Sequence, residues 1–333
     1  MSDNINIAQQ KLHPIFISCD GWLAVFELLP VKQLGFVIAM ISPRFARYVD
    51  EHFRTRKWSI GKMQIQWKEF EENRELQIVN KFGDLPIPQI TIPKKALGFE
   101  LIRLINYVDQ PAVFAFMQNL HPLFTACRRG INVSFHIDGE PMISQFIMNQ
   151  IWPMFNENVC ALKFEKENDL QLLRHVTPSI LTDCPKLRII VSHGNLFPEM
   201  PANDSATGTD GQAMSKWLLA PCSADDAPKI LIIYWSNKKL AEKLDQLKTD
   251  FRNASSRANF IINNVDYQIS PNFTPFEETN ESTGESLVYK APLLIRRPIV
   301  HDVNKWSGWE KEALLWFFDD QFNKFMFSVC DLI

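Results

Sequence analysis

The sequence of 333 residues lacks both an export signal and a long apolar run. Its first residues, MSDNINIAQQKLHP, contain no basic stretch followed by an apolar one, so no secretory leader is recognisable. No segment reaches the roughly 18 consecutive apolar residues that a membrane-spanning helix needs. These absences predict a soluble intracellular protein of the cytoplasm, the nucleus or both, without a membrane partner. We expect residues 1–16 to form a flexible amino terminus.

Cysteine is sparse and the charge is nearly balanced. No two of the six cysteines are closely spaced, which indicates reduced core thiols rather than a disulfide framework or a zinc site. The formal net charge is −3, which argues against nucleic acid as a partner. The cysteines are Cys19, Cys127, Cys160, Cys184, Cys222 and Cys330.

Catalytic signatures are also missing. The seven histidines form no His-Glu-x-x-His pattern, and the chain has neither a Gly-x-Ser-x-Gly nucleophile motif nor a phosphate-binding glycine motif. His175 and Cys184 could form a thiol–imidazole pair, but we favour a helix residue followed by a buried thiol that opens the next strand. The sequence therefore predicts a non-enzymatic protein without a metal or cofactor. The alternative is an enzyme that acts in an apolar pocket without a recognisable motif.

What the chain does contain is a short helical module near its start, ISCDGWLAVFELLPVKQLGFVIAMISPRFARYVDEHFRT. Apolar residues recur near the helical period in three successive segments. Pro30 and Pro43 stand where the second and third helices should begin, and Ser42 supplies an N-cap oxygen to the third. Roughly 40 residues cannot bury so many large side chains by themselves, so the rest of the chain or another protein must cover them. We therefore interpret residues 17–58 as a docking module.

The module resembles an F-box, the three-helix segment through which receptors of ubiquitin ligases bind a Skp-type adaptor and, through it, a cullin. Leu29-Pro30 and Leu34 match the family's central Leu-Pro and the leucine of its second helix. Val25-Phe26 matches the Ile-Phe pair of the first helix. Ile41-Ser42 and Arg44-Phe45 match the Val-Ser and Arg-Phe positions. The family's opening Leu-Pro is replaced by Ile17-Ser18. The resemblance implies that the adaptor binds Ile17, Trp22, Leu23, Val25, Phe26, Leu29, Pro30, Leu34, Ile41 and Phe45.

Further stretches extend the resemblance over nearly the whole chain, to a family of F-box proteins expanded in nematodes. They are Asp50 to Phe53 with Arg56 to Trp58, Ile151 to Pro153, Asp183 to Arg188, Leu196 to Pro198, Lys216 to Leu218, and Leu293 to Ile299 ahead of Trp306 to Ala313. The resemblance implies a non-catalytic substrate receptor of a Skp–cullin–F-box ubiquitin ligase, which binds a target protein with its remaining domain. The alternative is a protein-binding scaffold in which the F-box helices are purely structural.

Beyond the module the apolar pattern becomes that of strands. Residues 58–68 alternate, and the later segment ELQIVNKF resembles a return strand, so we predict a hairpin. The segment DLPIPQITIP has lost several backbone donors and is predicted to be an extended connector. Residues 59–93 thus form a hairpin and connector, with the domain boundary near residues 83–93.

From residue 94 to 270 a strand-then-helix unit recurs. Amphipathic helical segments separate the strands, and stacking the units in chain order would bury the apolar face that each unit leaves bare. We expect α/β repeats with parallel strands in a solenoid similar to leucine-rich repeats. A non-repetitive α/β layer is the alternative, and it also predicts parallel strands. The predicted strands begin near Leu101, Ile131, Cys160, Lys186, Lys229 and Ala258.

Residues 271–333 are predicted to cap the repeats with antiparallel strands and a helix, which makes the fold class α+β. The strands are expected within FTPFEETNESTGESLVYK and LLIRRPI. The aromatic residues between Trp306 and Phe327 either seal the core or bind a target. Sealing is favoured because Trp309, Ala313 and Trp316 fall on one helical stripe.

Overall fold

The computed structural model describes residues 17–26, 28–29, 34–55, 58–59, 62–67, 76–80, 83–86, 96–105, 111–127, 130–137, 141–193, 196–221, 226–234, 240–265, 274–321 and 323–329. The chain forms two compact units, Met1–Ser59 and Ile60–Ile333. The boundary therefore follows Ser59, whereas the sequence predicted it near residues 83–93. The predicted flexible terminus and most of the proline-rich connector lie outside the described residues. No helix in the described ranges is long and apolar enough to cross a membrane.

The small unit consists of short helices. They are α1 (Cys19–Phe26), the π-helical turn η1 (Leu34–Ile38), α3 (Ala39–Ile41) and α4 (Pro43–Thr55), and the short strand β1 (Trp58–Ser59) follows. Helix α4 begins at Pro43, and Ser42 Oγ accepts a hydrogen bond of 3.3 Å from Phe45 N, which confirms the predicted cap. Pro30, where the sequence predicts the second helix to begin, lies outside the described residues.

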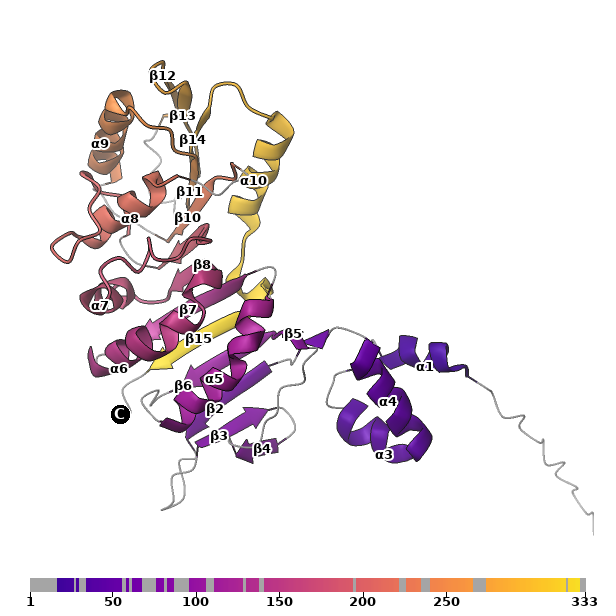
Figure 1. Cartoon of the computed structure of the whole chain (residues 1–333). Helices are drawn as coiled ribbons and strands as arrows, with labels where there is room; N and C mark the ends of the chain where they lie inside the picture. The colour runs from indigo at the N-terminus through magenta and orange to yellow at the C-terminus, as the bar shows by residue number, and fades with distance from the viewer. Residues whose placement is uncertain are drawn as a thin grey trace, which may run out of the picture. The chain divides into compact units, whose positions relative to one another are not determined.

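One mixed sheet of 13 strands organises the large unit (Figure 1), in the order β12-β13-β14-β11-β10-β9-β8-β7-β15-β6-β2-β3-β4. Its central strands run parallel: β2 (Lys62–Trp67), β6 (Leu101–Ile105), β7 (Ile131–Ile137), β8 (Val159–Phe164), β9 (Ile189–Ser192), β10 (Lys229–Ile233), β11 (Phe260–Asn264) and β15 (Lys324–Val329). Antiparallel strands complete both ends: β3 (Leu76–Asn80) and β4 (Gly83–Pro86) at one, and β12 (Phe276–Asn280), β13 (Glu285–Lys290) and β14 (Leu293–Pro298) at the other. The short strand β5 (Ala96–Gly98) precedes β6. The predicted hairpin is confirmed, and a strand begins at or near each of the six positions predicted between residues 94 and 270.

Helices and short helical turns follow the strands along the chain. They are α5 (Pro111–Ala126), α6 (Pro141–Phe146), η3 (Ile147–Ile151), η4 (Trp152–Met154), η5 (Asn156–Asn158), α7 (Asp169–Val176), α8 (Asp210–Leu219), α9 (Leu240–Asn253), α10 (Val303–Leu315) and η7 (Phe318–Asp320). Figure 1 shows α6 to α9 on one face of the sheet and α10 on the other. The fold is therefore α+β with one large mixed sheet.

Period-two alternation in the strands determines which residues face the helices. Phe135 of β7 contacts Trp152 of η4 at a ring-centroid distance of 5.8 Å, and Phe124 of α5 contacts Phe325 of β15 at 6.1 Å. All four of these rings are buried. The main core of the large unit therefore lies between the sheet and helices α5 to α9.

The last strand departs from the predicted order. The prediction places residues 271–333 as a cap at one end, and β12 to β14 form such a cap, but β15 inserts in parallel between β6 and β7, in the interior of the sheet. The units are therefore not stacked strictly in chain order. The crossover through α5 leaves room for one strand between β6 and β7, and the side chains of Phe325 and Phe327 are buried there.

Helix α10 crosses the opposite face of the sheet and covers its β8–β14 end. Trp306 and Ala313 are buried against a cluster that includes Ile189 and Ile230, and Trp309 and Trp316 pack on it in half-buried positions. The aromatic residues of this helix therefore seal a core, as the sequence favoured. Two ion pairs fix the helix to the strands, Arg188–Glu312 at 2.7 Å and Arg297–Glu310 at 3.1 Å.

Candidate functional site

The interior of the small unit contains most of the residues predicted to bind an adaptor. Phe26 and Leu34 are buried with Val49, and the rings of Trp22 and Phe45 meet edge to face at 4.8 Å. The half-buried members packed on this cluster include Leu23 and Leu29. These side chains hold the helices together, since large side chains in mutual contact are removed from water.

Three of the predicted residues are instead exposed. The exposed fractions are 38% for Ile17, 40% for Val25 and 60% for Ile41. Pro30 lies outside the described residues. The predicted set therefore divides between the interior of the small unit and its surface.

Three further apolar side chains that the sequence reasoning did not include are exposed on the same unit. Leu28 is 84% exposed, Val37 57% and Met40 79%. They could have been found as apolar residues outside the helical stripes that form the cluster. Together with the three exposed predicted residues they make up what we call the exposed apolar set: Ile17, Val25, Leu28, Val37, Met40 and Ile41.

So many large apolar side chains in contact with water are unusual for a unit of this size. Exposed apolar groups on a small folded unit are characteristic of protein-binding surfaces. Methionine in particular is common on surfaces that adapt to a partner. The exposed apolar set is therefore the candidate interaction surface of the small unit.

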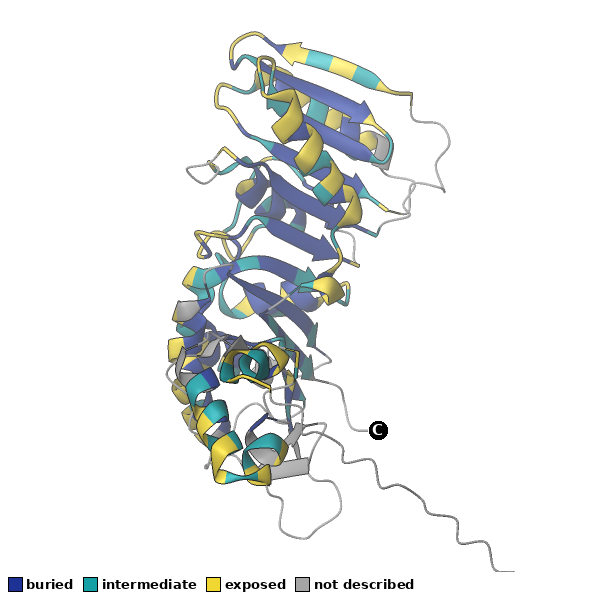
Figure 2. Ribbon diagram, turned by 90° about the vertical axis from the view of Figure 1, so that its right-hand side faces the viewer, coloured by how far each residue is buried: buried dark blue, intermediate teal, exposed yellow. Residues whose placement is uncertain are grey.

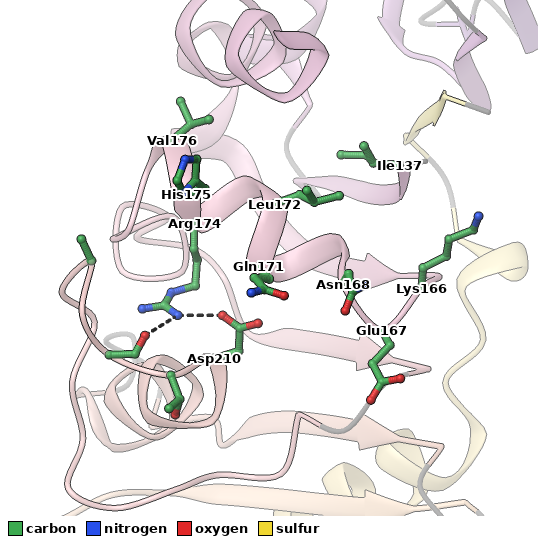
Figure 3. Close-up of a pocket in the computed structure, with 13 residues that line it drawn as sticks. Ile137, Lys166, Glu167, Asn168, Gln171, Leu172, Arg174, His175, Val176 and Asp210 are labelled. Atoms are coloured by element: carbon green, nitrogen blue, oxygen red, sulfur yellow. Dashed lines mark hydrogen bonds and ion pairs between the residues drawn. The ribbon is translucent and has the colours of Figure 1, made fainter. Parts of the chain in front are cut away.

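The large unit contains a cleft of about 1010 Å³ at the carboxyl ends of β7 and β8 (Figure 3). Its walls are the end of β7, the turn after β8, helix α7 and residues 206–210. The carboxyl ends of parallel strands are where α/β proteins commonly bind ligands. The cleft is thus a second candidate for recognition.

A buried carboxylate joins the two strand ends below this cleft. Asp169 Oδ1 accepts a hydrogen bond of 2.9 Å from Ile137 N, and Asp169 Oδ2 accepts one of 2.7 Å from Lys166 N. Burial raises the pKa of Asp169, against the opposing effect of these donors. The residue orders the floor of the cleft rather than reacting with a ligand.

Arg174 orders the outer wall of the cleft. Its guanidinium, which is 6% exposed, donates to Asp210 Oδ1 at 2.7 Å and to Gly208 O at 3.0 Å (Figure 3). It also donates to Ser205 O at 2.9 Å. Thr209 caps helix α8 in a capping box with Gln212. Because its donors are occupied by the protein, Arg174 is a structural residue of the cleft.

His175 and Cys184, the pair considered in the sequence, differ in their relation to the cleft. His175 is exposed at its side, whereas Cys184 is buried and its Sγ donates to Ile180 O at 3.4 Å. Burial raises the pKa of the Cys184 thiol far above its ordinary value, which disfavours the thiolate. Among the described residues no group of three or more His, Cys, Asp or Glu side chains could hold a metal ion. The cleft can form hydrogen bonds to a ligand through Asn168 and Gln171.

Comparison with known proteins finds no matching family model, no similar curated protein and no similar solved structure.

Proposed function

We propose that the chain is a substrate-recognition subunit of a Skp–cullin–F-box ubiquitin ligase, of the F-box family expanded in nematodes. The observation that supports the proposal best is the exposed apolar set on the small unit, where F-box-like positions such as Val25 and Ile41 are exposed. The small unit would bind the Skp-type adaptor and, through it, the cullin. The large unit would bind a target protein inside the cell, in the cytoplasm, the nucleus or both.

The protein would contribute no catalytic group of its own. Holding the target beside the ubiquitin-transferring partner raises the effective concentration of its lysines, which accelerates transfer without chemistry in the receptor. A broad sheet anchored by a continuous core suits this role because a rigid receptor loses little conformational freedom on binding. No cofactor enters this proposal.

A second candidate function is a protein-binding scaffold whose F-box-like helices are structural. The observation that favours it is the burial of Phe26 and Leu34 and the packing of Trp22 and Phe45 beside them. In this case the helices would form a stable subdomain without recruiting a ligase.

Capture by a purified Skp-type adaptor tests the first proposal against the second. We expect wild-type chain to be retained by the immobilised adaptor and Met40→Asp/Ile41→Asp to be lost, since a charge on a desolvated anchor costs about 2 kcal/mol or more. Val300→Asp is the matched control, because Val300 is 92% exposed on the large unit. Equal retention of all three proteins, or retention of none, would leave the scaffold as the better explanation.

A further inference from the structure

One face of the sheet, at its β2–β8 end, carries polar side chains instead of an apolar core. The strand register places one row of residues side by side on this face. From β2 to β8 the row is Gln64, Arg103, Met326, Ser134 and Lys163. The intervening residues, such as Phe325 and Phe327, point to the helices on the other side. We call this the polar sheet face: Lys62, Gln64, Leu101, Arg103, Ile105, Asn132, Ser134, His136, Lys163, Lys324, Met326 and Ser328.

Helix α10 covers only the other end of this side of the sheet. Its cluster reaches from β14 to Ala161 of β8. Figure 2 looks onto this side and shows α10 in front of the strands at one end. The short turn η7 follows α10 on the same side, and the ring of its Phe318 lies 5.6 Å from Lys163 Nζ of β8. Arg103 and Met326 are half-buried, as side chains on a flat sheet surface are. A partner can therefore reach the part of the polar sheet face around Lys62 and Arg103, whereas Asn132 and Ser134 are buried.

The strands contribute charges of one sign to this surface, but the carboxylate of Glu165, which follows β8, also lies on it and accepts a hydrogen bond of 3.2 Å from Ser134 Oγ. The strands β2, β6, β15, β7 and β8 contain the charged residues Lys62, Arg103, Lys324 and Lys163, all of them cationic and all on the polar sheet face. The carboxylate that follows β8, Glu165, pairs with Lys163 at 2.8 Å. The chain as a whole has a net charge of −3, so this local excess of positive charge runs against the composition.

Arg103 lies near the centre of the surface and its donors are poorly used. Its Nε is buried without a hydrogen-bond partner among the described residues, and its Nη2 contacts only the weak acceptor Met326 Sδ, at 3.6 Å. A guanidinium whose donors lack strong acceptors binds a carboxylate favourably, because the carboxylate can accept two parallel hydrogen bonds from it. Lys62 is exposed one strand away and adds a second cation.

We propose that the polar sheet face binds an acidic peptide segment of another protein, with a carboxylate on Arg103. The three strands that carry Lys62, Arg103 and Lys324 span about 10 Å, which roughly three extended residues cover. That the acidic segment belongs to a target of the ligase rests on the proposed function. Binding of the peptide itself does not require the adaptor. Nucleic acid is the less suitable partner because the overall negative charge opposes a polyanion.

Fluorescence anisotropy of labelled peptides with the full chain tests the proposal in the absence of adaptor. We expect a ten-residue glutamate-rich peptide to bind, the same peptide with glutamine in place of glutamate to bind at least about tenfold more weakly, and added salt to weaken binding. A single-stranded RNA of matched length is the third probe. No binding of the acidic peptide, equal binding of the glutamine peptide, or tighter binding of the RNA would overturn the proposal.

Variants locate the site. We expect Arg103→Gln to weaken acidic-peptide binding by about tenfold or more, and Arg103→Lys to recover only part of it because lysine lacks the bidentate fork. Lys62→Gln keeps the test decisive if Arg103→Gln fails to fold, since Lys62 is exposed.

Lys311→Gln, at an exposed position of α10, is the matched control with the same loss of charge. If Lys311→Gln weakens binding as much as Lys62→Gln, the attraction is non-specific and the site is wrong. Adaptor capture in parallel separates failure of this site from failure of the proposed function.

Discussion

Phe327 of β15 stacks on Phe135 of β7, with ring centroids 5.2 Å apart and ring planes only 5° apart. The two residues are also direct neighbours in the strand register. Their contact ties the last strand of the chain to a strand formed almost 200 residues earlier, and both rings are buried under the helices. The end of the sequence is therefore part of the central core of the large unit.

Removing this ring should destabilise the large unit. We expect Phe327→Ala to lower the free energy of unfolding by about 3–5 kcal/mol, because a buried aromatic ring is lost and a cavity remains. Urea unfolding followed by tryptophan fluorescence measures the change. Phe317→Ala is the control, since Phe317 lies in the same part of the chain and is 55% exposed. Similar losses for the two variants would contradict the central position of β15.

The position of β15 illustrates what the sequence could and could not predict. The alternation in KFMFSV is typical of a strand, and the six repeat strands were found from the same kind of pattern. The neighbours of a strand, however, depend on which gap in the sheet remains open after the crossovers have formed. No local pattern near Lys324 indicates that the gap lies between β6 and β7. The polar sheet face escaped the sequence analysis for the same reason, since Arg103 and Met326 become neighbours only through that insertion.

The candidate docking residues were found only in part, because an apolar stripe on a short helix can face either its own unit or a partner. Periodicity identified Phe26 and Leu34 as members of stripes, and both are buried inside the small unit. Leu28 and Met40 lie outside the stripes and were omitted, yet they are the most exposed large apolar residues in the described part of that unit. Which apolar groups remain in water depends on the packing of all the helices together.

The Arg174–Asp210 pair at 2.7 Å should matter more for stability than a surface pair of similar length. We expect Arg174→Ala to lower the free energy of unfolding by about 2–4 kcal/mol, because Asp210 and two backbone carbonyls lose a buried donor. Arg252→Ala is the matched control, since Arg252 pairs with Glu278 at 2.6 Å while its side chain is 57% exposed. We expect little change from the control because solvent screens exposed pairs.

Urea unfolding of both arginine variants checks this expectation. Limited proteolysis adds a local readout, because residues 205–210 are held by Arg174 and should be cut faster in Arg174→Ala only. Equal stability losses in the two variants would show that burial does not decide the contribution of these pairs.

Asp250 should make stability depend on pH in the direction opposite to most carboxylates. Its Oδ2 is buried without a hydrogen-bond partner among the described residues, and burial raises its pKa. The folded state therefore holds this proton more tightly than the unfolded state, in which the pKa is about 3.9. Stability must then fall as the pH rises from that value through the raised pKa of the folded state, because ionisation of Asp250 is less favourable in the fold.

Asp250→Asn removes this ionisation and keeps the shape of the side chain. We expect the variant to have a higher Tm than wild type at pH 7 and an equal Tm near pH 3, where the wild-type carboxyl is protonated in both states. Thermal unfolding followed by circular dichroism at the two pH values measures the difference. Asp245→Asn is the control, because Asp245 lies on the same helix with 77% of its side chain exposed. A variant with lower Tm than wild type at pH 7 would mean that the ionised Asp250 stabilises the fold, and the inferred direction of its pKa shift would be wrong.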